Sequence, residues 1–90
     1  MERSGDDLER LHNLGPVSAG RLRAAGIETV DDLRRLGAVE AYVRLKRAFP
    51  METTQISLYA IHGALIGVRW YALSDEVRAA LRDAAARRLP

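Results

Sequence analysis

The stretch Leu11–Gly37, "LHNLGPVSAGRLRAAGIETVDDLRRLG", decides the fold, and it is typical of short helices joined by very tight turns. Pro16 suits the first turn of a helix, because its missing N–H would have no partner there. Gly26 suits the left-handed backbone position that directly follows a helix. The sequence therefore predicts a helix over residues 16–25, entered through the tight turn at residues 13–16.

Helical signals continue through the rest of the chain. Ser4 is a candidate N-cap, Thr29 and Asp32 resemble a capping box, and Ser74 is placed to cap the last helix. No segment alternates apolar and polar residues with the period of a strand. We expect an all-α, compact domain of about five to six short helices. Besides the helix at 16–25, helices are expected near residues 4–13, 29–37, 38–49, 55–68 and 75–89.

The composition is that of one folded domain. The chain has 90 residues, of which 48% are hydrophobic and 29% charged. We expect a single domain over residues 1–90 with its core within about 8–88. Cysteine is absent, which excludes disulfides and thiolate metal sites and fits a reducing cytoplasm. The first ten residues lack the apolar segment of a signal peptide, and the longest apolar run, residues 56–68, is too short to cross a membrane.

The apolar segment 55–68 is expected to be the central, buried helix, since it is hydrophobic on nearly every side. Gly63, Ala64 and Gly67 give it a face of small residues, which a neighbouring helix or a second copy of the chain can approach closely. Trp70 and Tyr71 follow it directly. Packing against the last helix is the simpler expectation for this aromatic pair, and an exposed pair indicates a protein-contact site.

The turn at residues 13–15 also resembles the helix-hairpin-helix, a DNA-binding element built on a Gly-hydrophobic-Gly turn. Asn13 takes the place of the first glycine, which is allowed because asparagine tolerates a left-handed backbone. In such an element, backbone N–H groups at Leu14, Gly15 and Val17 point at a phosphate. The candidate nucleic-acid contacts are Asn13, Leu14, Gly15, Val17, Ser18, Arg21, Arg23, Arg44, Lys46 and Arg47.

The charge pattern leaves a second interpretation open, in which the hairpin is only a compact corner. Val17 stands where phosphate binders often have a cation, and valine cannot neutralise a phosphate. The net charge is +2, from 14 basic and 12 acidic residues. Many of these charges stand at helical ion-pair spacings, among them Asp75 with Arg78 and Asp83 with Arg87. Direct DNA binding requires the arginines and the lysine to converge on the side that the hairpin faces.

No pattern of catalytic or metal-binding residues is present in the sequence. His12 and His62 are the two histidines, and neither has a second ligand at metal-binding spacing. The glycines of the opening stretch do not form a nucleotide-binding loop after a strand. We therefore expect no enzyme, no metal, no cofactor and no small-molecule substrate.

Three motifs together resemble one known family: "NLGPVS", "AGIETVDDLRRLGAVEAY" and "LYAIHGAL" with the tryptophan that follows it. The chain, from about Leu8 to Leu81, is similar to the C-terminal domain of TfoX/Sxy competence regulators. The resemblance implies a small helical domain and a role in regulating DNA uptake and natural transformation. It also implies that an α/β domain precedes this one in two-domain members. Three hypotheses follow: an interaction module of this type with a protein or nucleic-acid partner, a direct DNA binder, and a structural homodimer.

Overall fold

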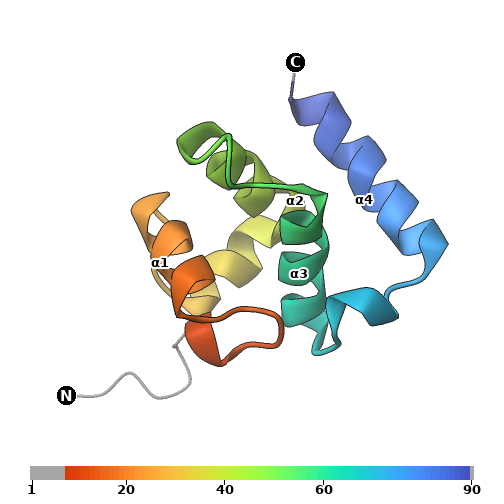
Figure 1. Ribbon diagram of the computed structural model, residues 1–90. Coiled ribbons are helices and arrows are strands. Elements are labelled where there is room, and N and C mark those ends of the chain that lie inside the picture. The colour runs from red at the N-terminus through yellow and green to blue at the C-terminus, as the bar shows by residue number, and fades with distance from the viewer. Residues whose placement is uncertain (1–7, 90) are drawn as a thin grey trace.

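The computed structural model describes residues 8–89, and this part of the chain is built from helices alone. Two short 3-10 turns, η1 (Leu8–Arg10) and η2 (Trp70–Ala72), accompany the four helices α1 (Pro16–Ala24), α2 (Val30–Ala48), α3 (Gln55–Ile66) and α4 (Asp75–Arg88). Figure 1 shows α1 and α4 on opposite sides of the molecule, with α2 and α3 between them. The prediction of an all-α domain is confirmed, and the expected number of helices is approximately right.

The turns have the backbone conformations that their residue types predict. Asn13 has a positive φ of 70°, Pro16 is the first residue of α1, and Gly26 has a φ of 92° just after α1. The helices predicted at 29–37 and 38–49 are one element, α2, broken at Gly37 by non-helical φ and ψ of 81° and 167°. Glycine adopts this backbone conformation without steric penalty, so the kink lies where the sequence predicts a helix end.

Two hydrophobic clusters share α2 and α3. The first joins η1, α1, one face of α2 along most of its length, and α3, and its fully buried members include Leu8, Leu22, Ile27 and Leu33. The second joins α4 to α2 and α3, and it consists of Tyr42, Leu58, Tyr59, Leu73, Leu81 and Ala85. Each fully buried leucine contributes about 1.5–3 kcal/mol through removal of apolar surface from water. The helix pair α2–α3 is therefore the centre of the fold.

Three expectations about the helices need correction. The helix predicted from Ser4 begins outside the described residues, and its described part is the short turn η1. The segment 55–68 is central but not buried all round, because Ile56 and Ile66 are 49% and 55% exposed. Arg78, placed by spacing to pair with Asp75, instead donates to the carbonyl oxygen of Tyr71 and lies over the Trp70 ring.

Helix α2 begins with the predicted capping box. The Asp32 N–H donates to Thr29 Oγ1 at 3.0 Å, and the Thr29 N–H donates to Asp32 Oδ2 at 3.3 Å. The backbone N–H of Glu28 also donates to Asp32 Oδ2, and these bonds hold the pKa of the Asp32 carboxyl below its usual value. The two side chains thus satisfy backbone donors that the first turn of a helix leaves without partners.

Replacing Thr29 with alanine is expected to lower the free energy of unfolding by about 1 kcal/mol, because the Asp32 N–H loses its acceptor. Urea denaturation followed by circular dichroism measures the change. Glu28→Ala is the matched control, since Glu28 is exposed and its side chain makes no hydrogen bond or ion pair with residues 8–89. Equal losses for the two variants would contradict the role given to the Thr29 hydroxyl.

Candidate functional site

The side chain of Asn13 links the hairpin before α1 to α3 and to the segment that follows α3. Asn13 Nδ2 donates to the carbonyl oxygens of Ala60 at 3.2 Å and Val68 at 2.9 Å. Asn13 Oδ1 accepts from the backbone N–H of Trp70 at 3.0 Å. The left-handed backbone predicted for Asn13 is confirmed. Its side chain, however, is fully engaged inside the molecule and makes its three bonds to backbone groups of this chain.

The backbone donors of the hairpin are only partly available to a ligand. The Leu14 N–H donates to the carbonyl oxygen of Leu11 at 3.2 Å, and the Leu14 side chain is buried. The N–H groups of Gly15 and Val17 have no acceptor among residues 8–89. Ser18, in the first turn of α1, faces a surface cleft that it shares with α3. Two of the three backbone donors expected to face a phosphate are therefore without a partner in the described chain.

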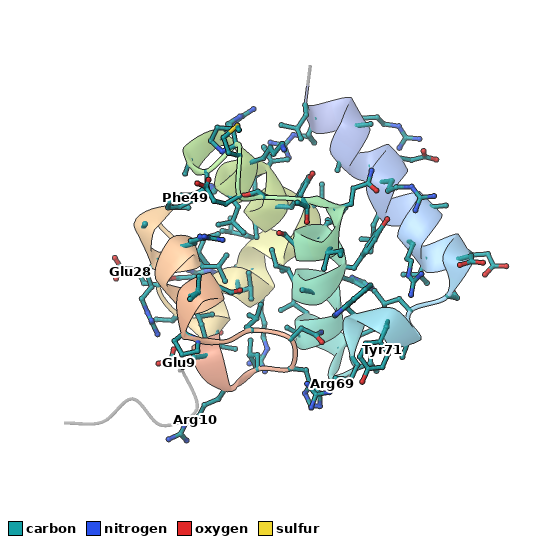
Figure 2. All side chains as sticks on the ribbon, viewed as in Figure 1. Glu9, Arg10, Glu28, Phe49, Arg69 and Tyr71 are labelled. Carbon is teal, nitrogen blue, oxygen red and sulfur yellow. The ribbon has the colours of Figure 1, made fainter. Side chains whose placement is uncertain are left out.

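Four of the five candidate cations are engaged within the molecule. Arg23 pairs with Glu9 at 2.7 Å, and Arg44 Nε pairs with Glu40 at 3.0 Å. Lys46 Nζ donates to the carbonyl oxygens of residues 50 and 53, at 3.1 and 2.9 Å. The Arg21 guanidinium lies 5.9 Å from the centre of the Phe49 ring, which Figure 2 labels near the end of α2.

These cations do not converge on the hairpin. Arg23 reaches η1, whose Glu9 is labelled at the lower left of Figure 2. Arg44 shares Glu40 with Arg88 at the end of α4, on the opposite side of the molecule (Figure 1). Arg47 is exposed and forms no ion pair with residues 8–89. Arg21 lines the same cleft as Leu14 and Ser18, whereas Arg44 lies at the contact of α2 with α4, so the five cations do not all gather at the hairpin.

The aromatic pair after α3 is divided between interior and surface. Trp70 is half-buried beneath the Arg78 guanidinium, which lies 5.9 Å from the ring centre, so this ring packs against α4 as expected. Tyr71 is 64% exposed, and its ring meets the Trp70 ring edge-on at 5.9 Å. Figure 2 labels Tyr71 and Arg69 in the lower right part of the molecule. Tyr71 is thus the accessible member of the proposed protein-contact pair.

The small-residue face of α3 is occupied by the chain itself. A methyl group on Gly63 would lie 2.6 Å from both Asn13 Nδ2 and the carbonyl oxygen of Val68. Ala64 is buried in the first hydrophobic cluster, and Gly67 ends the helix in a left-handed conformation. The face expected to receive a neighbouring helix therefore receives the Asn13 hairpin and the segment after α3.

A surface cleft that sequence reasoning missed opens between α1 and α3. Its apolar floor consists of Leu14, Leu22, Leu45, Ala60 and Ile61, and its polar rim includes Ser18, Arg21, Glu52 and Ser57. The cleft has a volume of about 40 Å³. Val17, Met51 and Ile56, which are 66%, 88% and 49% exposed, are each the chain neighbour of a rim residue. We call the rim together with these three side chains the cleft surface.

The chain matches the TfoX C-terminal domain over residues 4–85, which is nearly its whole length. It belongs to the TfoX C-terminal domain family. At the level of the family, this membership supports a competence-related regulatory domain. The resemblance carried by the three sequence motifs is confirmed.

Two crystal structures from Listeria monocytogenes are similar to this TfoX C-terminal domain. An uncharacterized protein in a triclinic form is 33% identical with a TM-score of 0.78, and the match covers 83% of this chain and 84% of that one. A protein of unknown function in a tetragonal form is 31% identical with a TM-score of 0.80, covering 89% and 98% respectively. No curated protein matches the chain.

Histidine and acidic side chains do not gather into a metal-binding group within residues 8–89 of this TfoX C-terminal domain. No three histidine, aspartate or glutamate side chains in this range lie close enough together to hold a metal ion. His12 is exposed and His62 is half-buried on α3. No helix in the same range is long and apolar enough to cross a membrane.

Glu40, on α2, pairs with one arginine on its own helix and one on α4. Its Oε2 accepts from Arg44 Nε at 3.0 Å, and its Oε1 pairs with Arg88 Nη1 at 2.5 Å. The hydrogen bonds from Arg44 and then Arg88 hold the pKa of the Glu40 carboxyl below its usual value of 4.5. Since Arg88 is the last residue of α4, Glu40 ties this end of α4 to α2.

The free energy of unfolding is therefore expected to fall in acid, partly because Glu40 becomes protonated there. Its folded pKa is depressed, so its contribution is present above the usual value of 4.5 and is lost as the pH falls through the lower folded pKa. Glu40→Gln is expected to lower the free energy of unfolding by up to about 1 kcal/mol at neutral pH and to leave a flatter decline below pH 4.5. Urea titrations at several pH values check this. Glu28→Gln, at an exposed carboxylate, is the control, and an unchanged acid limb in Glu40→Gln would contradict the assignment.

Proposed function

We propose that this TfoX C-terminal domain is a non-enzymatic protein-contact module of competence regulation, and that it acts through the cleft surface. The observation that carries the proposal is an apolar-floored cleft whose rim residues Ser18, Glu52 and Ser57 each have an exposed large apolar residue as their chain neighbour: Val17, Met51 and Ile56. Exposed apolar side chains scattered singly need no explanation, but a group beside a concave surface is typical of a protein-interaction site. A cytoplasmic location, which the absence of cysteine favours, is part of the proposal.

The engagement of the candidate cations with partners inside the molecule favours contact with a protein rather than with a nucleic acid. Binding to phosphates draws its free energy largely from cations that release counterions. Arg23, Arg44 and Lys46 already have internal partners, and Arg21 is stacked on an aromatic ring. Protein interfaces, in contrast, depend on apolar side chains at their centre with a polar rim, which is the composition of the cleft surface.

Genetic replacement tests the proposal. In the organism that encodes the chain, the double variant Val17→Gln/Ile56→Gln is expected to lower the frequency of transformation by marker DNA about tenfold, the loss expected from weakening one contact by about 1.4 kcal/mol. Both positions are exposed, so protein levels on an immunoblot should stay at those of the wild type. Ile66→Gln, an equally exposed site at the other end of α3, is the matched control. Wild-type transformation by the double variant would overturn the proposal.

Direct DNA binding through the hairpin is the second candidate, and the unpartnered N–H groups of Gly15 and Val17 are the observation that favours it. Since the cations do not converge, we expect fluorescence anisotropy to show affinity for duplex DNA no tighter than about 10⁻⁴ M, the weak end of non-specific binding. Val17→Lys should leave this affinity unchanged. Binding that is tighter, falls steeply with added salt and strengthens in Val17→Lys would establish the hairpin as a DNA contact.

A further inference from the structure

Another cavity, with a volume of about 130 Å³, lies where α4 packs beside α2 and α3 (Figure 1). Its lining comes from all three helices and from the residue that follows α4. Four of the lining residues are apolar and three are polar: Leu58, Ala85, Ala86 and Leu89, with Tyr42, Gln55 and Arg82. The cavity shares no residue with the cleft surface, so an inference drawn from it goes beyond the proposed function.

Tyr42 brings to this cavity a hydroxyl group without a hydrogen-bond partner. Only 6% of the residue is exposed, and its hydroxyl makes no hydrogen bond with residues 8–89. The hydroxyl is still within reach of solvent, because the unpaired side-chain atoms that solvent cannot reach in this range are Arg23 Nε and Arg78 Nε. Since Tyr42 is otherwise buried and lines the cavity, the cavity is where its hydroxyl meets solvent. A buried tyrosine hydroxyl usually has a partner, so this one is available to a bound group.

Arg82 brings a positive charge that no carboxylate neutralises at close range. Its Nη1 donates to the Tyr59 hydroxyl at 2.8 Å, which leaves most of the guanidinium N–H groups for other acceptors. It forms no salt bridge with an acidic residue in the described part of the chain, and no acidic residue lines the cavity. A guanidinium binds a carboxylate through two parallel hydrogen bonds, which are among the strongest in proteins. The cavity therefore favours an anion over a cation.

The size and the apolar lining of the cavity narrow the class of anion. A protein cavity of about 150 Å³ holds benzene, so one of about 130 Å³ accommodates a ligand of about six non-hydrogen atoms. The side chains of Leu58, Ala85, Ala86 and Leu89 offer apolar surface to carbon atoms. Inorganic phosphate would lose water against this surface without a compensating hydrogen bond. A carboxylate with a chain of about four carbons satisfies both the charge and the apolar lining.

We infer that the cavity between α2, α3 and α4 binds a small carboxylate with a short apolar chain, of the size of butanoate. The carboxylate accepts hydrogen bonds from the Arg82 guanidinium and from the Tyr42 hydroxyl, and its carbon chain packs on Leu58 and the alanines of α4. The chain binds this ligand and does not convert it, so the site is a ligand-binding site and not a catalytic one. Because the lining comes from three helices, the bound ligand contacts α4 and the α2–α3 pair together.

An NMR titration of the isotope-labelled chain with sodium butanoate, at constant pH and sodium concentration, tests the inference. We expect backbone amide shifts, largest at Leu58, Ala85 and Ala86, that saturate with a dissociation constant of about 0.1–10 mM, the range open to so small a ligand. Butanamide, which lacks the charge, and inorganic phosphate, which lacks the carbon chain, should each bind at least about tenfold more weakly. Shifts that do not saturate, or equal binding of butanamide or phosphate, would overturn the inference.

Two variants test the polar groups of the cavity, each beside a matched control. Tyr42→Phe should raise the dissociation constant for butanoate about 3–10-fold without lowering stability, because its hydroxyl has no partner in the described chain. Tyr71→Phe, at an exposed tyrosine outside the cavity, should leave the constant unchanged. Arg82→Gln should raise it at least about tenfold, whereas Arg87→Gln, the same change of charge elsewhere on α4, should not. A wild-type constant in either cavity variant, or an equal rise in its control, would overturn the carboxylate site.

Discussion

Replacing Asn13 with alanine is expected to lower the free energy of unfolding by about 3 kcal/mol, one of the largest effects available to a single substitution in this domain. The side chain makes three hydrogen bonds to backbone groups of Ala60, Val68 and Trp70. Removing it leaves the Val68 carbonyl oxygen and the Trp70 N–H without this partner, whereas the Ala60 carbonyl, inside α3, keeps its helical hydrogen bond. A group left desolvated and unpaired costs about 1–3 kcal/mol. Alanine also adopts the positive φ of 70° less readily than asparagine.

Urea denaturation of Asn13→Ala and Asn13→Gly separates the two causes. Glycine accepts the left-handed backbone but restores none of the bonds, so Asn13→Gly should retain most of the loss and recover only up to about 1 kcal/mol. The remaining difference from the wild type measures the hydrogen bonds. Recovery of the full wild-type stability in Asn13→Gly would show that the three bonds do not stabilise the fold.

Gly63→Ala is expected to be destabilising by about 1–3 kcal/mol, although helix propensity alone predicts the opposite sign. In an open helix, alanine in place of glycine stabilises by about 1 kcal/mol. Here the added methyl group would lie 2.6 Å from Asn13 Nδ2 and from the carbonyl oxygen of Val68. The second of these is a backbone atom, so the segment after α3 must move, and such overpacking costs more than the propensity gain.

Gly20→Ala is the matched control for this experiment. Gly20 also lies inside a helix, α1, but a methyl group there meets no atom within 4 Å. We expect Gly20→Ala to be stabilising by up to about 1 kcal/mol, in the same denaturation assay. If both substitutions stabilise the chain, the close contact between α3 and the Asn13 hairpin is wrong.

Asn13 and Gly63 should also be coupled. Because Asn13 Nδ2 is one of the two atoms that the new methyl group would meet, Asn13→Gly removes part of the clash. The double variant is therefore expected to be more stable than the sum of the single losses predicts, by about 0.5 kcal/mol or more. Simple additivity would indicate that the clash with Val68 accounts for the whole effect of Gly63→Ala.

Local signals were sufficient for the helices and the turns between them. The Thr29 capping box, the Ser74 cap and the positive φ of Asn13 and Gly26 depend on residues close in the chain, and the structure has each of them. Reasoning from neighbouring residues failed where a side chain contacts residues that are far away in the sequence. Arg78 has a suitable acid three residues earlier, yet its guanidinium packs on the rings of Tyr59 and Trp70, which come from other elements.

The candidate site was predicted less well for the same reason. Spacing marked Arg23, Arg44 and Lys46 as available cations, whereas their partners are Glu9, Glu40 and two carbonyl oxygens. From the sequence, Val17 was interpreted only as a valine at a position where phosphate-binding hairpins often carry a cation. Its place next to Ser18, which lines a cleft shared with α3, depends on contacts between residues far apart in the chain and has no local signature in the sequence.

By itself the sequence determined the helical class, the position of the breaks and the family, since these follow from the apolar period, from proline and glycine, and from motifs read along the chain. The tertiary structure decided what each exposed or charged side chain is free to do. The Asn13 side chain links the hairpin to α3 because α3 and the segment after it present two carbonyl groups and one N–H to it. The cleft surface arose because helix packing, which sums over contacts distant in sequence, left Val17, Met51 and Ile56 outside both hydrophobic clusters.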